Sequence, residues 1–473
     1  MAARLTAFLV AIIVGISVVA GLIVGAQREA EPAVDVLVYN GRVYTGDPNA
    51  PIAEAVAIRG NRILKIGSNR EIKRLRRNAA TVIDAHGGSI LPGFADTYVV
   101  VPGQADAIAG IHRLGLTSVG AVVDDLKSLD ALAALATTAD RPIRIAAALK
   151  TTLPLTGAIR RDIDARRTQG ATALVRLDAL AIDVVLPGPK PARPTGSRRP
   201  VPPPLLPNDQ QQALLELDRA GWPLVLHVDD ERELSVALDV IARLIETNTA
   251  LTAPRRHRVV LAHPMSLDTA RLATLGLTVA MPLPATWTGV AVDPAAAPAP
   301  VASTAAAGDT AVTATAPATV ADPAILPFSF PLPEGVRLVM GSEIVADPRL
   351  GLQALIGGAL APATTPGTAT PATDAAAGTE STPKADTDAD AAPVDRQLVI
   401  GALATLTTAA ANALGAHAEW GTLEPGRLAD LVVLSADLFE LPASHLLDAV
   451  VIATVVDGKV VYDRDTDTPP PTP

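Results

Sequence analysis

Metal chemistry in this chain would have to use imidazole and carboxylate groups. The sequence contains seven histidines and no cysteine, which excludes thiolate metal sites and disulfides. Two histidines, His227 and His263, follow the apolar runs PLVL and RVVLA, so we expect them at the carboxyl ends of strands. The other five do not end such a run, and we expect them to be surface residues: His86, His112, His257, His417 and His445.

Several other kinds of chemistry are not indicated. Ser342 has no His–Asp arrangement near it in the sequence, which argues against a serine hydrolase. No phosphate-binding glycine loop or zinc-finger spacing is visible. The formal charge is −10, with 39 basic and 49 acidic residues, and no basic cluster would follow a phosphate backbone. Nucleic acid is therefore not an expected partner.

The N-terminal segment predicts a membrane anchor. Residues 5–26 carry no charge, and a helix rising about 1.5 Å per residue over this run can cross a hydrocarbon core roughly 30 Å thick. Arg4 precedes the run and favours an orientation that leaves the rest of the chain outside the cytoplasm, in the periplasm or at the cell surface. Residues 1–33 are thus predicted to be a signal anchor. The alternative is a signal peptide cleaved after Val24-Gly25-Ala26, which would give a secreted protein.

Eight apolar, β-branched runs alternate with amphipathic stretches through the middle of the chain. Nearly continuous apolar runs are typical of strands buried on both faces. The clearest helix is Glu231–Thr247, where Asp230 is the expected N-cap and Glu233 would complete a capping box. The pattern predicts an α/β fold with a (β/α)8 TIM barrel. The predicted strands lie near residues 95–101, 117–123, 142–149, 180–186, 223–228, 258–263, 277–283 and 336–342.

Both ends of the chain predict β-hairpins. The expected turns are Asn40-Gly41, Gly60-Asn61 and Asp457-Gly458, and residues 430–434 (DLVVL) add another strand. We therefore predict a small composite β-sandwich domain from residues 34–91 and 420–465, with the barrel in residues 92–419. Low-complexity composition predicts disordered inserts near residues 187–204, 293–324 and 362–395, and a disordered tail at 466–473.

Motifs at the junctions of the two predicted domains resemble the amidohydrolase superfamily. These are IDAHGGSILPGFAD (83–96) and GTLEPGRLADLVVL (421–434). Motifs within the barrel are similar to the branch that includes N-substituted formamide deformylases: IHRLGLTSVGAV (111–122), HRVVLAH (257–263) and VMGSEIVADPRLGL (339–352). The resemblance covers residues 34–465 apart from the inserts. It implies a distorted barrel with a mono- or dinuclear zinc site that activates water against amide or related C–N bonds.

The chain departs from the family at the metal ligands. The family's His-x-His motif after Pro-Gly-Phe-x-Asp-x is replaced by Tyr98-Val99-Val100. Valine has no lone pair to donate, and a phenol ionises only near pH 10. The resemblance places Asp183 at or near the bridging lysine of strand four, and His227 and His263 at the histidines of strands five and six. Glu343 replaces the strand-eight aspartate, which is a metal ligand and general base in the family.

Two hypotheses follow from these substitutions. In the first, the protein is a degenerate, membrane-tethered amidohydrolase-like protein that is impaired or inactive as a hydrolase, binds no metal and serves as a binding or structural module. In the second, His227, His263, Asp183 and Glu343 form a rearranged mononuclear zinc site that hydrolyses non-peptide C–N bonds, with Glu343 as general base. The expected ligand is a small amide-like molecule in either case. A third interpretation is an interaction platform that uses the inserts as arms, and the sequence does not identify the oligomeric state.

Overall fold

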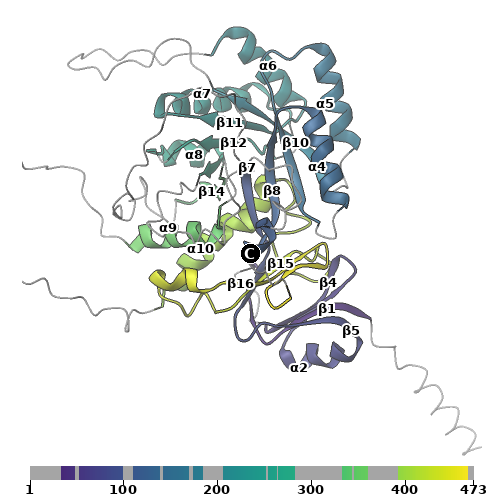
Figure 1. The fold of residues 1–473 in the computed structure, drawn as a ribbon. Coiled ribbons are helices and arrows are strands. Elements are labelled where there is room, and N and C mark those ends of the chain that lie inside the picture. The colour runs from purple at the N-terminus through teal and green to yellow at the C-terminus, as the bar shows by residue number, and fades with distance from the viewer. Residues whose placement is uncertain are drawn as a thin grey trace, which may run out of the picture.

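The fold was analysed in a computed structural model of the chain (Figure 1). The predicted anchor in residues 5–26, Val100, Glu343, the tail from residue 467 and most of the predicted inserts lie outside the described residues. Within the described residues, no helix combines the length and apolar character needed to cross a bilayer. The residues that the structure describes are 33–47, 53–99, 110–138, 142–169, 174–184, 206–251, 254–263, 265–282, 333–342, 346–360 and 393–466.

An eight-stranded parallel sheet forms a nearly closed barrel, which confirms the predicted α/β barrel. The sheet order is β14-β13-β12-β11-β10-β9-β8-β7, so each strand lies beside its neighbour in sequence. Every predicted run overlaps one strand. The strands are β7 (Phe94–Val99), β8 (Leu116–Val123), β9 (Arg144–Lys150), β10 (Val175–Asp183), β11 (Leu224–Val228), β12 (Arg258–Leu261), β13 (Thr278–Met281) and β14 (Arg337–Met340).

The fourth strand begins earlier than the sequence predicted. β10 starts at Val175 rather than near residue 180, because Arg176 and Asp178 interrupt the apolar run without interrupting the strand. Asp178 is buried and accepts hydrogen bonds from both Nη atoms of Arg256, at 3.0 Å each. The polar residues Arg176 and Asp178 therefore made the first half of this strand unrecognisable from the apolar pattern.

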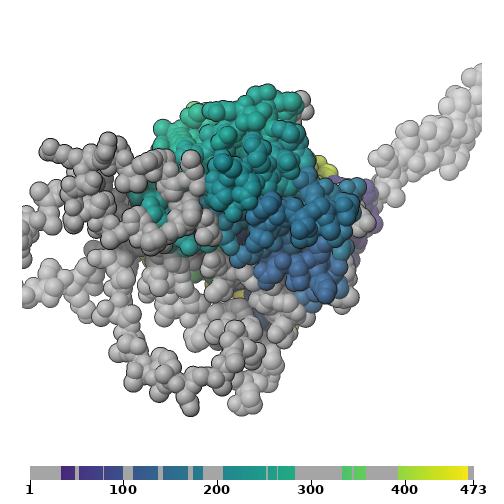
Figure 2. Space-filling model, turned by 90° about the horizontal axis from the view of Figure 1, so that it is seen from above, coloured from purple at the N-terminus to yellow at the C-terminus, as the bar shows by residue number. Residues whose placement is uncertain are grey.

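Helices cover the outside of the barrel, where α4, α5, α6 and α7 flank the strands in Figure 1. Seen from above in Figure 2, the segments of residues 110–169 and 206–282 form a continuous outer surface. The helices are α4 (Leu126–Thr138), α5 (Gly157–Gln169), α6 (Asn208–Arg219), α7 (Glu231–Thr247), α8 (Thr269–Leu275), α9 (Pro348–Leu360), α10 (Arg396–Leu406) and α11 (Thr408–Ala413).

The helix predicted over residues 231–247 is confirmed with the same bounds. Asp230 is its N-cap, and its carboxylate accepts from the backbone N–H groups of Arg232 and Glu233. The predicted capping box is wrong by one residue, because the Glu233 carboxylate accepts from the N–H of Asp229 rather than of Asp230. Asp395 caps α10 by accepting from the backbone N–H groups of Gln397 and Leu398.

Helix α11 packs against the inner face of the barrel sheet. Its last residue, Ala413, shares a buried cluster with inward alanines of the strands, including Ala148, Ala181 and Ala280. Small residues at these positions leave room for the helix. The carbonyl groups at its C-terminus, which have no partner within the helix, accept hydrogen bonds from arginines. Arg258 donates to Ala413 O at 2.9 Å, and Arg176 donates to Leu414 O at 2.6 Å. A helix C-terminus is a favourable place for cations.

Strands from both ends of the chain form two small sheets beside the barrel (Figure 1). One has the order β4-β3-β1-β5, and the other has the order β17-β16-β15-β6-β2. Val38, Ile58, Ile90, Val433 and Val455 belong to one buried cluster that draws on both sheets. The bounds are β1 (Val34–Tyr39), β2 (Arg42–Val43), β3 (Ala55–Arg59), β4 (Arg62–Gly67), α2 (Asn69–Ile72), β5 (Ala79–Asp84), β6 (Ser89–Pro92), β15 (Leu431–Leu434), β16 (Val451–Val456) and β17 (Lys459–Asp463). The domain boundaries at residues 91 and 420 remain predictions.

Two of the three predicted hairpins are confirmed. The turn at Gly60-Asn61 joins the antiparallel strands β3 and β4, and the turn at Asp457-Gly458 joins β16 and β17. The hairpin at Asn40-Gly41 is wrong. Asn40 does adopt a positive φ of 60°, but β2 then leaves β1 and pairs with β6 in the other sheet. A Cβ on Gly41 would lie 2.7 Å from Ile90 Cδ1. Glycine at this position therefore allows the chain to pass close to β6 as it crosses from one sheet to the other.

Arg144 joins the barrel to the small sheets. From the start of β9 it contacts Asp430, with Nε to Oδ2 at 2.5 Å, and Asp457, with Nη2 to Oδ1 at 2.8 Å. The Asp430 side chain is only 1% exposed. Removing one partner of a buried ion pair leaves an uncompensated charge, which makes the pair costly to break.

We predict that Arg144→Met lowers the free energy of unfolding by about 3 kcal/mol, because it leaves the buried Asp430 carboxylate unpaired. Urea denaturation measures the change. Arg166→Met is the matched control, because Arg166 pairs with Asp130 at the surface, where the loss should stay within about 0.5 kcal/mol. Equal losses in the two variants would contradict the prediction.

Candidate functional site

Asp183 and His227 lie together at the carboxyl end of the barrel. Asp183 is the last residue of β10, and it is the register partner of His227 on β11. Paired residues on adjacent strands point to the same face of a sheet. These two predicted site residues are therefore neighbours at the end of the barrel where barrel enzymes carry their chemistry.

The Tyr98 ring packs across the barrel against His227. Tyr98 is on β7, the first strand of the barrel, and His227 is on β11, the fifth. The two side chains therefore come from opposite walls of the barrel. Their ring centroids are 5.8 Å apart with an interplanar angle of 17°, a stacked arrangement. The His227 side chain is 16% exposed, and its Nδ1 lies 3.7 Å from Asp229 Oδ1. The Tyr98 ring therefore occupies the space beside the His227 imidazole.

Lys150 is a site residue that sequence reasoning missed. It ends β9, and its Nζ lies 3.1 Å from Asp183 Oδ2. Both side chains are about half exposed, so the pair adds little to stability. Its effect on the site is local, because it places a positive charge beside the Asp183 carboxylate. The only sequence signal was a lysine closing the apolar run IRIAAAL.

The remaining predicted ligands are His263 and Glu343. His263 is exposed, two residues beyond the end of β12. Glu343 and Val100 lie outside the described residues. Within the described ranges, no group of three histidines, aspartates or glutamates is arranged to hold a metal ion.

Asp96, in the motif PGFAD, is buried where the first and last strands meet. Its Oδ1 accepts from the backbone N–H of Tyr98 and of Ser342, at 3.1 Å each, and its Oδ2 accepts from the Ser342 hydroxyl. Burial raises the pKa of this carboxyl to about 7, although the hydrogen bonds from Ser342 and Tyr98 act to lower it. Ser342 is thus a partner of Asp96 and has no histidine in contact among the described residues.

Two of the histidines predicted to be surface residues are buried. His257 is 4% exposed, and its Nε2 lies 2.9 Å from Asp218 Oδ1 while its Nδ1 accepts from the N–H of Leu224. His112 is fully buried with Nε2 3.1 Å from Pro142 O. Their partners are 30 or more residues away, so nothing in the local sequence marked them. His86 and His417 are exposed, as predicted.

Sequence comparison matches short parts of this chain to known proteins. Residues 399–462 match the model of a family described as the amidohydrolase family. Over 65 residues the chain is 37% identical to the protein LONG AFTER FAR-RED 3 of Arabidopsis thaliana. Over 71 residues it is 41% identical to a 5-methylthioadenosine/S-adenosylhomocysteine deaminase of Symbiobacterium thermophilum. These matches span 14% and 13% of this chain and only 11% and 16% of the two relatives.

Structural comparison extends the likeness to nearly the whole chain. An adenosine deaminase from Xanthomonas campestris with bound zinc matches with a TM-score of 0.54 and 15% identity, over 93% of this chain and 96% of that one. The guanine deaminase of E. coli matches at 0.52 and 15%, over 92% and 100%. The ochratoxinase of A. niger matches at 0.52 and 13%, over 91% and 96%. At these identities the likeness shows the fold alone.

Asp96 predicts a pH dependence of stability. Its pKa in the folded protein is about 7 against an ordinary value of 3.8, so between these values the folded state holds a proton that the unfolded chain has released. Stability therefore falls as pH rises through this window, by up to about 4 kcal/mol. Asp96→Asn should remove this component, because asparagine stays neutral and can still accept from the two N–H groups.

Urea denaturation over this pH window, with wild type and Asp96→Asn in parallel, isolates the contribution. Asp124→Asn, at an exposed position after β8, is the control and should keep the wild-type slope. If Asp96→Asn has the same slope as wild type, Asp96 does not titrate as described.

Proposed function

The match over residues 399–462 and the shared fold support an amidohydrolase-superfamily protein, and from this premise we propose that the chain has lost the hydrolytic metal centre. It then serves as a binding or structural module whose carboxyl-end site takes a small amide-like molecule without hydrolysing it. The observation that carries the proposal is the stack of Tyr98 on His227 across the barrel.

The stack opposes a zinc site for steric and chemical reasons. A hydrolytic zinc requires about three protein ligands in fixed geometry and an open position for water. The Tyr98 ring lies 5.8 Å from the imidazole that would be one ligand, and it takes space where family members are expected to supply further imidazoles. A neutral phenol does not replace them, because it ionises only near pH 10.

The charge beside Asp183 opposes a cation as well. Lys150 neutralises this carboxylate at 3.1 Å, so a metal ion would have to displace the ammonium group or accept its repulsion. The described residues at the carboxyl end therefore do not fit a zinc ion.

A second candidate function is hydrolysis of non-peptide C–N bonds at a rearranged mononuclear site. The pairing of Asp183 with His227 on neighbouring strands favours it, because the two side chains share one face. His263 and Glu343 would have to complete the ligand set, with Glu343 as general base. The zinc bound in the Xanthomonas campestris deaminase makes the metal plausible for this fold.

We also propose that residues 5–26 attach the protein to the outer face of a membrane. The run is uncharged over a length that can cross the hydrocarbon core. Cleavage after Ala26, followed by secretion, is the alternative, and N-terminal sequencing of the mature protein distinguishes the two.

Metal content separates the two candidate functions. We predict that the full chain, purified without chelators, holds well under one zinc per molecule by plasma mass spectrometry. Tyr98→His/Val100→His should raise the zinc content toward one, because it restores the two imidazoles that the resemblance implies for strand one and removes the stacked ring.

His227→Ala and His417→Ala are the matched pair of controls, since His417 is an exposed histidine far from these strands in sequence. Stoichiometric zinc in the wild type, lost in His227→Ala but kept in His417→Ala, would favour the hydrolase alternative and overturn the proposal.

A further inference from the structure

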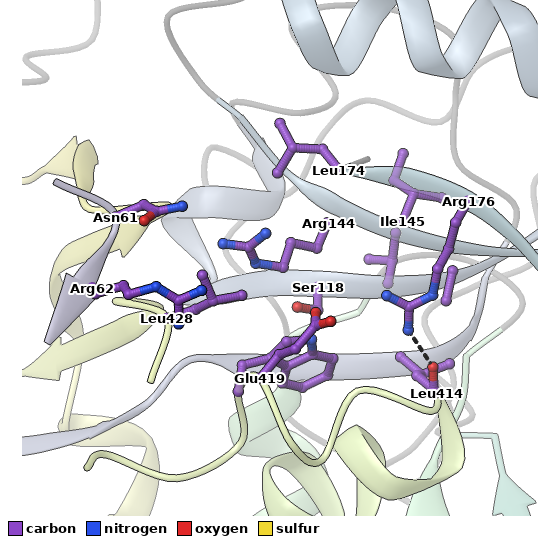
Figure 3. A pocket seen from close by; sticks show the side chains of 13 residues that line it. Asn61, Arg62, Ser118, Arg144, Ile145, Leu174, Arg176, Leu414, Glu419 and Leu428 are labelled. Carbon is purple, nitrogen blue, oxygen red and sulfur yellow. Dashed lines mark hydrogen bonds between the residues drawn. The ribbon is translucent and has the colours of Figure 1, made fainter. Parts of the chain in front are cut away.

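A cavity of about 220 Å³ lies at the amino end of the barrel (Figure 3). Its walls come from the first residues of β8, β9 and β10, from β4 of the small sheets, and from the segment that follows α11. Tyr98 and His227 are at the other end of the barrel strands. The cavity is therefore separate from the candidate site.

Strand register places three polar side chains on one wall of this cavity. Ser118 on β8 is the register partner of Arg144 on β9, and Ala146, two residues on, is the partner of Arg176 on β10. Residues two apart on a strand point the same way, so all four side chains share a face. Ser118, Arg144 and Arg176 line the cavity together.

These three side chains keep unused hydrogen-bond donors. Arg144 uses Nε and Nη2 on Asp430 and Asp457, and Arg176 uses Nη2 on Leu414 O, which leaves Nη1 of each without a partner among the described residues. The Ser118 hydroxyl is buried, and no described residue bonds to it. A buried hydroxyl without a partner is costly, so an acceptor in the cavity would lower the free energy.

Glu419 adds a negative charge to the lining of the cavity. It is exposed and makes no ion pair with any described residue, and Figure 3 draws its carboxylate toward Ser118. Arg62 lines the same side, where its Nη1 donates to Gly426 O at 2.6 Å. Asn61 adds a further polar group, and the apolar side chains of Leu174, Trp420 and Leu428 complete the lining.

We propose that this cavity binds a small zwitterionic amino acid with an apolar side chain. The carboxylate accepts from Ser118 and from the free Nη1 groups of Arg144 and Arg176. The ammonium group faces Glu419, and the side chain packs against Leu174, Trp420 and Leu428. A cavity of 150 Å³ holds benzene, so this volume suits a molecule of about nine non-hydrogen atoms, the size of leucine.

Titration calorimetry on the full chain tests the proposal with three probes of matched shape: L-leucine, 4-methylpentanoate, which lacks the amine, and 3-methylbutylamine, which lacks the carboxylate. We expect saturable binding of leucine and binding about tenfold weaker for each analogue, because each loses a charged contact. Saturable binding that is equal for leucine and 4-methylpentanoate would overturn the assignment, as would no leucine binding up to about 10 mM.

Two variants connect the binding to the named residues. Glu419→Gln should weaken leucine about tenfold and leave 4-methylpentanoate unchanged, because only the ammonium contact is lost. Ser118→Ala should weaken both about fivefold without lowering stability, since the hydroxyl has no partner in the described protein. Glu216→Gln, on the exposed face of α6, is the control. Leucine binding that none of these variants alters would place it elsewhere and refute the proposal.

Discussion

Two side chains of β7 close the barrel. β7 and β14 share no ladder of backbone hydrogen bonds, although both strands are fully described. Instead, Thr97 Oγ1 donates to Met340 O at 2.6 Å, and buried Asp96 accepts from the N–H and hydroxyl groups of Ser342. The neighbouring Gly341 permits this approach, because a Cβ there would lie 2.8 Å from the Cβ of Tyr98. The closure therefore fixes the backbone from which the Tyr98 ring reaches His227.

Side chains at the carboxyl end of the barrel consequently contact one another in pairs. Tyr98 stacks on His227, and Lys150 neutralises Asp183. A site that holds a metal needs the opposite arrangement, with lone pairs directed at a common point and their charges left for the cation. Here an aromatic ring fills the space beside His227, and a lysine supplies the positive charge beside Asp183.

The sequence predicted the parts of the fold that depend on local pattern. Eight apolar runs gave eight strands, and the helix at 231–247 was placed to the residue because its apolar stripe and Asp230 cap are local signals. Errors arose where residues distant in the sequence determine the strand pairing or the burial of a side chain. Asn40-Gly41 turns but does not make a hairpin, because β2 pairs with β6. The buried His257 depends on Asp218, 39 residues away, and Lys150 acquires its role only when β9 and β10 lie side by side.

The polar amino end of the barrel follows from the packing of α11. Inward alanines admit the helix, and the carbonyls at its C-terminus then need donors, which Arg176 and Arg258 supply. Burying such cations is unfavourable. Burial lowers the pKa of Arg258 to about 10, although the negative charge of nearby Asp178 acts to raise this pKa. A guanidinium carries five N–H donors, more than one carbonyl can accept. The spare N–H groups of Arg176 therefore arise from a structural requirement. In the cavity beside Ser118 and Arg144, these spare N–H groups of Arg176 are donors suited to a carboxylate.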